Sequence, residues 1–158
     1  MDALERLIAI EDIKQLNARY WQGLDTKDPA VLRSVFTDDA VIDFRAEHFT
    51  AENWPETTPP PDEFVPKALA RLAIFDTAHQ GHTLQVEFRS DSEADGVWPM
   101  EDYLWTKNPE EAGFACIHGH GYYFDSYRKT AEGWRISAMR LQRIHIEKDG
   151  VPTTGVYR

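Results

Sequence analysis

A chain of 158 residues that is 42% hydrophobic and 12% aromatic can bury one sizeable core, so we expect a single domain over residues 1–158. Its net charge of −10 disfavours binding to nucleic acid or anionic lipid, because an acidic surface releases no counterions from phosphates. The sequence has no run of about 20 apolar residues for a membrane span and no basic start typical of a signal peptide. Its one cysteine, Cys116, excludes an internal disulfide. Together these features predict a soluble, cytoplasmic protein.

The first half of the chain is predicted to be mostly helical. Apolar side chains recur at helical spacing in its first segment, and Asp28-Pro29 has the pattern of an N-cap followed by the first residue of a helix. The prolines that follow the first strand exclude helix there. The predicted segments are a helix over 2–26, a short helix after 28, a strand over 40–44, an irregular stretch over 45–61 and a helix over 62–78.

The second half is predicted to be strands joined by polar turns. Leu84, Val86 and Phe88 alternate with polar side chains, which is the period of a strand with one buried face. The predicted strands cover 82–89, 96–106, 114–129 and 134–146, and about 148–158 form a C-terminal tail. Helices followed by hairpin-connected strands predict an α+β domain whose curved antiparallel sheet makes a cone with the N-terminal helices. The expected pocket lies between the concave face and those helices.

Asp25 and His79 are the first candidate functional pair. An acid near the C-terminal end of a helix is unfavourable next to the helix dipole, so Asp25 needs a partner. A carboxylate that accepts a hydrogen bond from one imidazole nitrogen fixes the tautomer and leaves the other nitrogen as a general base. We predict an Asp25 oxygen within about 3.5 Å of a His79 ring nitrogen. The alternatives are a solvated helix-end acid and a packing histidine.

Tyr20 precedes Asp25 by five residues, which places the two about 140° apart on an ideal helix. They reach one site only if the helix end unwinds, and Gly23 could allow this. Tyr20 would then donate a hydrogen bond to a substrate oxygen.

Asp102 is a second acid in an apolar setting. Trp98, Met100 and Asp102 fall on one face of the predicted strand, whereas Val97, Tyr103 and Trp105 fall on the other. A buried charge must be paired, so Asp102 is either functional or bridged to one of the arginines. The second face is too apolar to remain exposed, which predicts a homo-oligomer.

His118 and His120 lie on one strand face and are placed to share a metal, with His79, His82 or an acid as a third ligand. Their spacing matches no established metal motif, and paired histidines on a strand are more often structural. Motifs for nucleotide, phosphate-loop and serine-hydrolase sites are absent from the sequence. We therefore expect no metal and no cofactor, and the roles of His82, His118 and His120 stay open.

Several segments in order resemble the SnoaL-like branch of the nuclear transport factor 2-like superfamily, in particular scytalone dehydratase, hexachlorocyclohexane dehydrochlorinase and bile acid 7α-dehydratase. The segments are Tyr20-x4-Asp25, FTDDAV at 36–41, TAHQGHTLQVEF at 77–88, GVWPMEDY at 96–103 and GYYFDSYRKTAEGWRI at 121–136. The resemblance implies a cone-shaped, cystatin-like α+β barrel closed by helices, and a trimer without a cofactor.

The resemblance also implies site residues. The lyases of this branch use an Asp–His dyad, which corresponds to Asp25 and His79, and bile acid dehydratases add residues at the positions of Tyr20 and Asp102. The chain departs from scytalone dehydratase at Leu104 and Tyr123, where that enzyme has histidine and asparagine. It departs from the dehydrochlorinase at Met139, where that enzyme has arginine and where this chain has Arg140 next to it.

We expect a cofactor-independent lyase, a dehydratase or a related eliminating or isomerising enzyme, that acts on a mostly apolar cyclic molecule by general base catalysis. The expected catalytic residues are Asp25, His79, Tyr20 and Asp102, and the expected substrate-binding residues are Trp98, Tyr123, Met100 and Phe36. The alternatives are a polyketide cyclase, a hydrolase, a non-catalytic ligand-binding member and a structural subunit like the small subunit of ring-hydroxylating dioxygenases.

Overall fold

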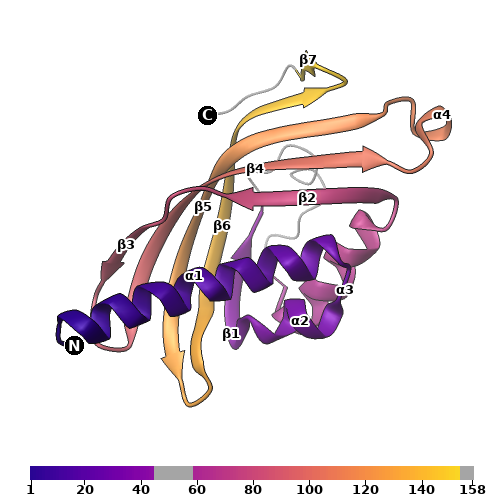
Figure 1. The fold of residues 1–158 in the computed structure, drawn as a ribbon. Coiled ribbons are helices and arrows are strands. Elements are labelled where there is room, and N and C mark those ends of the chain that lie inside the picture. Colours follow the sequence, from indigo (N-terminus) through magenta and orange to yellow (C-terminus); the bar gives the residue numbers. More distant parts are fainter. Residues whose placement is uncertain (45–58, 154–158) are drawn as a thin grey trace.

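Three helices lie on one side of a curved sheet in the computed structural model, which describes residues 1–44 and 59–153 (Figure 1). The predicted irregular stretch 45–61 and the tail 148–158 lie partly outside the described residues. The helices are α1 (Ala3–Asp25), α2 (Pro29–Ser34), α3 (Pro61–Leu72) and the short α4 (Pro109–Ala112). The strands are β1 (Phe36–Asp43), β2 (Phe75–Gly81), β3 (Gln85–Phe88), β4 (Glu93–Thr106), β5 (Cys116–Thr130), β6 (Gly133–Lys148) and β7 (Val151–Pro152). The fold is therefore α+β, as predicted.

The sheet is mixed rather than fully antiparallel. Its seven strands follow the order β1-β6-β5-β4-β2 in the described part of the chain, with β3 paired to β4 and β7 paired to β6. Strands β3 to β6 pair antiparallel as predicted. Strand β2, in a segment predicted to be helical, also pairs antiparallel with β4, whereas β1 runs parallel to β6. The prediction was wrong for β1 because about 90 residues separate the two strands, so no hairpin turn dictates their relative direction. The sheet remains open and curves over the helices (Figure 1).

Helix α1 packs its apolar stripe into the concave face. Its N-terminus is closed by a capping box between Asp2 and Glu5. Residues Ile13, Leu16, Tyr20 and Leu24 recur every three or four positions and are all buried. No helix in the described part of the chain is long and apolar enough to cross a membrane.

Gly23 serves helix packing rather than unwinding. Helix α1 continues regularly to Asp25, which contradicts the expected loosening of its end. A Cβ atom on Gly23 would lie 2.8 Å from the backbone nitrogen of Leu32, so this glycine lets α2 approach α1 closely. Helix α2 starts where predicted, because the Asp28 side chain accepts hydrogen bonds from the backbone N–H groups of Ala30 and Val31.

Helix α3 ends at Leu72, and residues 75–81 form strand β2, so the predicted helix over 62–78 is wrong in its last part. Phe75 continues the helical stripe of α3, but it also starts an alternation in which Asp76 and Gln80 are exposed. Residues 75–81 pair with β4 along the whole of β2, and this pairing favours the strand period over the helical one. This pairing sets His79 directly opposite Asp102.

Candidate active site

The Asp25 carboxylate meets the His79 ring where the end of α1 crosses β2. Oδ1 of Asp25 lies 2.6 Å from Nδ1 of His79, so the predicted contact is confirmed. The backbone N–H of His79 also donates to Oδ2 of Asp25, at 3.0 Å. The two carboxylate oxygens therefore hold both the ring and the backbone of His79. The His79 side chain is only 6% exposed, and that of Asp25 is 26% exposed.

Two polar side chains support Asp25. The Thr77 hydroxyl donates to Oδ1 of Asp25 at 2.8 Å, and the Lys27 ammonium donates to the Thr77 hydroxyl at 2.7 Å. Burial by itself raises the pKa of Asp25, but the hydrogen bonds from His79 and Thr77 and the charge of His79 outweigh it and lower that pKa. Asp25 is therefore an ionised acceptor, which suits an orienting role and a hydrogen bond from Nδ1–H.

Asp102 is paired with Arg143, a residue that the sequence did not single out. The guanidinium donates from Nη1 to Oδ1 at 2.8 Å and from Nη2 to Oδ2 at 2.5 Å, and both side chains are almost completely buried. Oδ2 of Asp102 also lies 3.8 Å from Nε2 of His79. His79 thus stands between two carboxylates, one bonded to Nδ1 and one beyond hydrogen-bonding distance of Nε2.

The space for this ion pair is made by Gly119 on β5. A Cβ atom there would lie 2.5 Å from Nη1 of Arg143 and 2.7 Å from Oδ1 of Asp102. The glycine in the sequence His118-Gly-His120 therefore lets a buried ion pair rest against the strand, while the flanking histidines point to the opposite face.

A cavity of about 720 Å³ opens beside His79. Tyr20, His79, Asp102, Arg143 and Tyr123 share its wall, most of which is apolar. The apolar lining includes Leu24, Phe44, Phe64, Leu72, Phe75, Leu104, Phe114, Ile117 and Leu141. The dyad therefore faces a space large enough for a small cyclic molecule.

The structure does not bring every expected substrate-binding residue to the cavity. Among the described residues, the wall does not include Trp98, Met100 or Phe36, which are buried in the core. Trp98 instead donates a hydrogen bond to the Tyr127 hydroxyl at 2.8 Å. Phe36 packs edge-on against Tyr20, with ring centroids 5.9 Å apart.

Sequence reasoning missed the basic residues of the wall. Lys67 and Arg71 from α3, and Arg143 and Lys148 from β6, line the cavity of this acidic chain. The position that corresponds to the arginine of the dehydrochlorinase did not point to Arg143. Met139 at that position is buried, and the neighbouring Arg140 lies over the Phe124 ring. The only feature of the sequence that could have identified Arg143 is its position on the inward face of the strand that forms β6.

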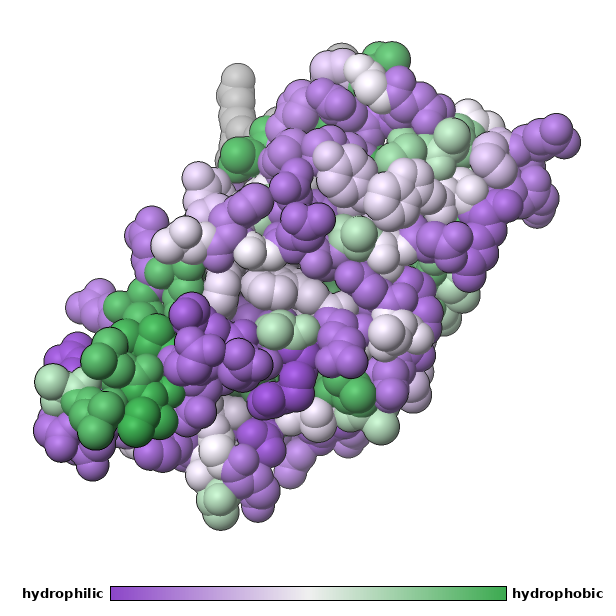
Figure 2. Space-filling view, in the orientation of Figure 1, coloured by the Kyte–Doolittle hydropathy of each residue, from purple (hydrophilic) through white to green (hydrophobic). Residues whose placement is uncertain are grey.

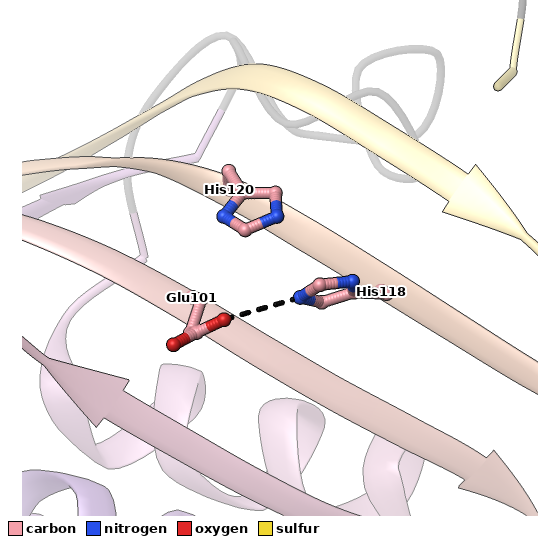
Figure 3. A group of neighbouring side chains, drawn as sticks. All are labelled: Glu101, His118 and His120. Carbon is pink, nitrogen blue, oxygen red and sulfur yellow. Dashed lines mark hydrogen bonds and ion pairs between the residues drawn. The ribbon is translucent and has the colours of Figure 1, made fainter. Parts of the chain in front are cut away.

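One group of side chains in the described part of the chain has metal-ligand spacing. It consists of Glu101, His118 and His120, and it lies outside the cavity wall, on the other face of the sheet (Figure 3). The dyad therefore has no metal-ligand group of this kind beside it among the described residues.

Solved structures share this fold over almost the whole chain. The Kfla4162 protein from Kribbella flavida has a TM-score of 0.80 at 25% identity, covering 90% of this chain and 95% of that chain. A candidate scytalone dehydratase from Novosphingobium aromaticivorans has a TM-score of 0.78 at 18% identity, covering 92% and 91%. The hexachlorocyclohexane dehydrochlorinase LinA-type3 from Novosphingobium barchaimii has a TM-score of 0.76 at 20% identity, covering 98% and 97%. All three proteins are similar to this chain in fold.

A family model agrees with this likeness. The SnoaL-like domain matches residues 5–140, which include most of α1, with Asp25, and the strands that carry His79 and Asp102. With its N-terminal helices and its curved open sheet, the chain belongs to the SnoaL-like domain family of the nuclear transport factor 2-like superfamily.

Proposed function

We propose that this chain is a cofactor-independent lyase that eliminates water or a comparable leaving group from a mostly apolar cyclic molecule. The observation that carries the proposal is the placement of His79, whose Nδ1 is bonded to Asp25 while its ring lines the cavity. An imidazole held in this way has the geometry of a general base. The enzymes among the structural neighbours supply two leaving groups to test, hydroxide and chloride.

The proposed reaction begins with proton transfer to Nε2 of His79. The base takes the proton from a carbon atom beside an electron-withdrawing group, and the electron pair of that C–H bond becomes the new carbon–carbon double bond. The bond from the neighbouring carbon to the leaving group breaks, and the leaving group departs with its electron pair. A leaving hydroxide takes this proton back from the His79 imidazolium and departs as water, whereas chloride leaves as the ion and the imidazolium releases its proton to solvent.

The buried charges stabilise the imidazolium that forms in this step. Asp25 holds Nδ1–H, and Asp102 lies 3.8 Å from Nε2 while its own charge is balanced by Arg143. A positive charge that develops between two carboxylates is favoured in a site with little water. We assign Tyr20 to donate a hydrogen bond to the substrate oxygen, because its side chain lines the same cavity as His79.

The aromatic residues are proposed to shape the binding space. Tyr123 lines the cavity and packs edge-on against Tyr20, with centroids 5.7 Å apart. The Phe36 ring packs edge-on against the Tyr20 ring and helps to hold it in place. Trp98 and Met100 fill the core next to this wall, so we expect them to set the shape of the cavity rather than to touch the substrate.

The test is a turnover assay on a panel of cyclic compounds that carry a hydroxyl or chloride next to an acidic C–H bond. Mass spectrometry should detect a product that has lost one water or one HCl. The His79→Ala variant should lose on the order of 10²–10⁴-fold in kcat. The control is His82→Ala, which removes a half-exposed histidine three residues away and should keep normal turnover.

Three outcomes separate the alternatives. Saturable binding of the panel without product in the native chain favours a non-catalytic ligand-binding member. A product formed equally fast by His79→Ala and the native chain contradicts the proposed base. Formation of a ring-closed product would instead favour a cyclase.

We also propose that the chain forms a homo-oligomer, a trimer by analogy with the family. The face of the sheet away from the helices carries exposed Trp105 and Ile144, which are 45% and 48% exposed. The rings of Tyr103 and Trp105 stack side by side on this face, with centroids 5.4 Å apart. Exposed apolar surface of this kind is typical of an interface.

A further inference from the structure

A cluster of nitrogen and carboxylate ligands lies on the sheet face opposite the cavity. Glu101 on β4 is the direct cross-strand neighbour of His120 on β5, and His118 stands two residues before His120 on the same face. One ligand atom from each of the three residues lies within 4.8 Å of the other two. Figure 3 shows the three side chains converging from the two neighbouring strands.

The spacing is close to that of a coordinated ion. Zinc–nitrogen and zinc–oxygen bonds of about 2.0–2.1 Å at a tetrahedral angle place ligand atoms about 3.3 Å apart. Nε2 of His118 lies 3.2 Å from Oε2 of Glu101, so this edge of the tetrahedron is already formed. The His120 ring centroid is 4.4 Å from that of His118, and a ligand atom of His120 lies within 4.8 Å of those of Glu101 and His118.

The ligand side chains are held from outside the cluster. The His118 ring stacks on Tyr103, with centroids 3.9 Å apart and planes inclined by 11°. Nε2 of His82 lies 3.4 Å from Oε1 of Glu101, the oxygen that does not contact His118. Such outer partners orient the ligands of a metal and strengthen its binding.

A simple ion pair accounts for the cluster less well. His82, His118, His120 and His145 make up four of the six histidines of the chain, and the rings of His120 and His145 are 6.3 Å apart. Two of these imidazoles already share the single carboxylate of Glu101. A carboxylate with several imidazole nitrogens around it offers the donor atoms of a transition-metal site.

We propose that Glu101, His118 and His120 bind one divalent transition-metal ion of the zinc type, with a fourth position left for water or for His145. Two imidazoles and one carboxylate favour Zn²⁺, Co²⁺ or Ni²⁺ over Mg²⁺ and Ca²⁺, which prefer oxygen ligands. This proposal departs from the expectation of a metal-free chain. It lies apart from the dyad and does not depend on the proposed elimination.

The experiment is a titration of the untagged, chelator-treated full chain with ZnCl₂, followed by isothermal titration calorimetry. We expect one equivalent to bind with a dissociation constant in the micromolar range or tighter. His120→Gln and Glu101→Gln should each weaken binding by at least about 100-fold, the upper range seen when only an outer partner is lost. Circular dichroism of each variant verifies that the chain remains folded.

The matched control is His79→Gln, which removes a histidine from the opposite face of the same sheet. This variant should bind Zn²⁺ like the native chain. Co²⁺ bound to the native chain should give intense visible absorption of a four- or five-coordinate ion, and His118→Gln should remove it. The proposal is overturned if no saturable equivalent binds, if binding survives in the His118→Gln/His120→Gln double variant, or if only His79→Gln abolishes it.

Discussion

His79 is restrained in a way that selects one tautomer. Its Nδ1 lies 2.6 Å from an Asp25 oxygen, and Asp25 also receives hydrogen bonds from Thr77 and from the His79 backbone. An acceptor-only carboxylate requires a proton on Nδ1, which leaves a lone pair on Nε2. The position of one proton therefore decides whether the ring can act as a base toward the cavity.

We predict that neutral His79 carries its proton on Nδ1, and that Asp25→Asn shifts the proton to Nε2. The amide can present its NH₂ group to Nδ1, which then becomes the acceptor. Nitrogen-15 NMR of the imidazole resolves the two tautomers without any substrate. His82 serves as an internal reference, since its ring nitrogen pairs with Glu101 rather than with Asp25. An unchanged His79 tautomer in the variant would contradict the orienting role of Asp25.

Asp125 is a buried acid that the proposed chemistry does not use. It is 3% exposed and accepts hydrogen bonds from Asn17 at 3.0 Å and from the Tyr127 hydroxyl at 2.9 Å. Burial raises its pKa to about 7, and the two hydrogen bonds only partly oppose this. A neutral Asp125 can donate to Tyr127, which can then donate to the Asn17 oxygen 3.1 Å away.

This raised pKa predicts a stability that falls as pH increases. The folded chain binds the Asp125 proton up to about pH 7, whereas the unfolded chain releases it near pH 4. The contribution is therefore complete below about pH 4 and is lost between about pH 4 and pH 7, by up to about 4 kcal/mol. Asp125→Asn should flatten this part of the profile in urea unfolding between pH 4.5 and 8. Asp76→Asn, which changes an acid that is 77% exposed, is the matched control. A native-like slope in Asp125→Asn would exclude Asp125 as its source.

Gly119 on strand β5 lies between two different environments. On the cavity side of Gly119 lies the Asp102–Arg143 ion pair, and on the other side lie His118 and His120. Any side chain at this position must share the space of two buried charged groups. The strand therefore requires glycine because of a close approach and not because of its backbone conformation.

We predict that Gly119→Ala destabilises the fold by about 1–3 kcal/mol, the usual cost of overpacking a buried site. The added Cβ atom overlaps Nη1 of Arg143 at 2.5 Å, and moving that group strains a bidentate contact. The measurement is urea unfolding of the four chains in a double-mutant cycle with Asp102→Asn. The cost should be smaller where the ion pair is already weakened. If Gly119→Ala lowers the free energy of unfolding equally in the native and Asp102→Asn chains, Gly119 does not act through the ion pair.

The helices and strands also show how much of the fold local sequence patterns can predict. Alternation along β4 placed Trp98, Met100 and Asp102 on the inner face, and their burial confirms it. The assignment failed at β2, because Phe75 fits both a helical and a strand period and only pairing with β4 decides. The direction of β1 was not predictable either, since it depends on a partner far along the chain.

The candidate active site could likewise be predicted only in part from local sequence patterns. Asp25 and His79 could be paired from helix electrostatics and family resemblance, and their contact is present. Arg143 could not be chosen among the arginines, because its link to Asp102 spans 41 residues and two intervening strand pairings. Tyr20 reaches the cavity together with His79 although α1 does not unwind, because β2 brings His79 to the helix end.

At the scale of the whole molecule, two exposed apolar areas in the described part of the chain are candidates for an assembly interface. One lies over the N-terminal part of α1, where Leu4, Leu7 and Ile8 are 66%, 64% and 53% exposed (Figure 2). The other is the outer sheet face with Trp105 and Ile144. The first is about one helical turn long, whereas the second continues into the partly exposed rings of Tyr103, Tyr122 and Phe124. The broader face is the better candidate for an interface.

We therefore predict a homotrimer that is held together through the outer sheet face. Sedimentation velocity at micromolar concentration should give a single species three times the mass of the 18.2 kDa chain. Trp105→Glu places a charge where an apolar surface must be desolvated, so it should shift the distribution to monomer while circular dichroism stays native. Leu7→Glu makes the same change on the α1 patch and should leave the trimer intact. Dissociation by Leu7→Glu but not by Trp105→Glu would move the interface to α1, and a monomeric native chain would exclude the assembly altogether.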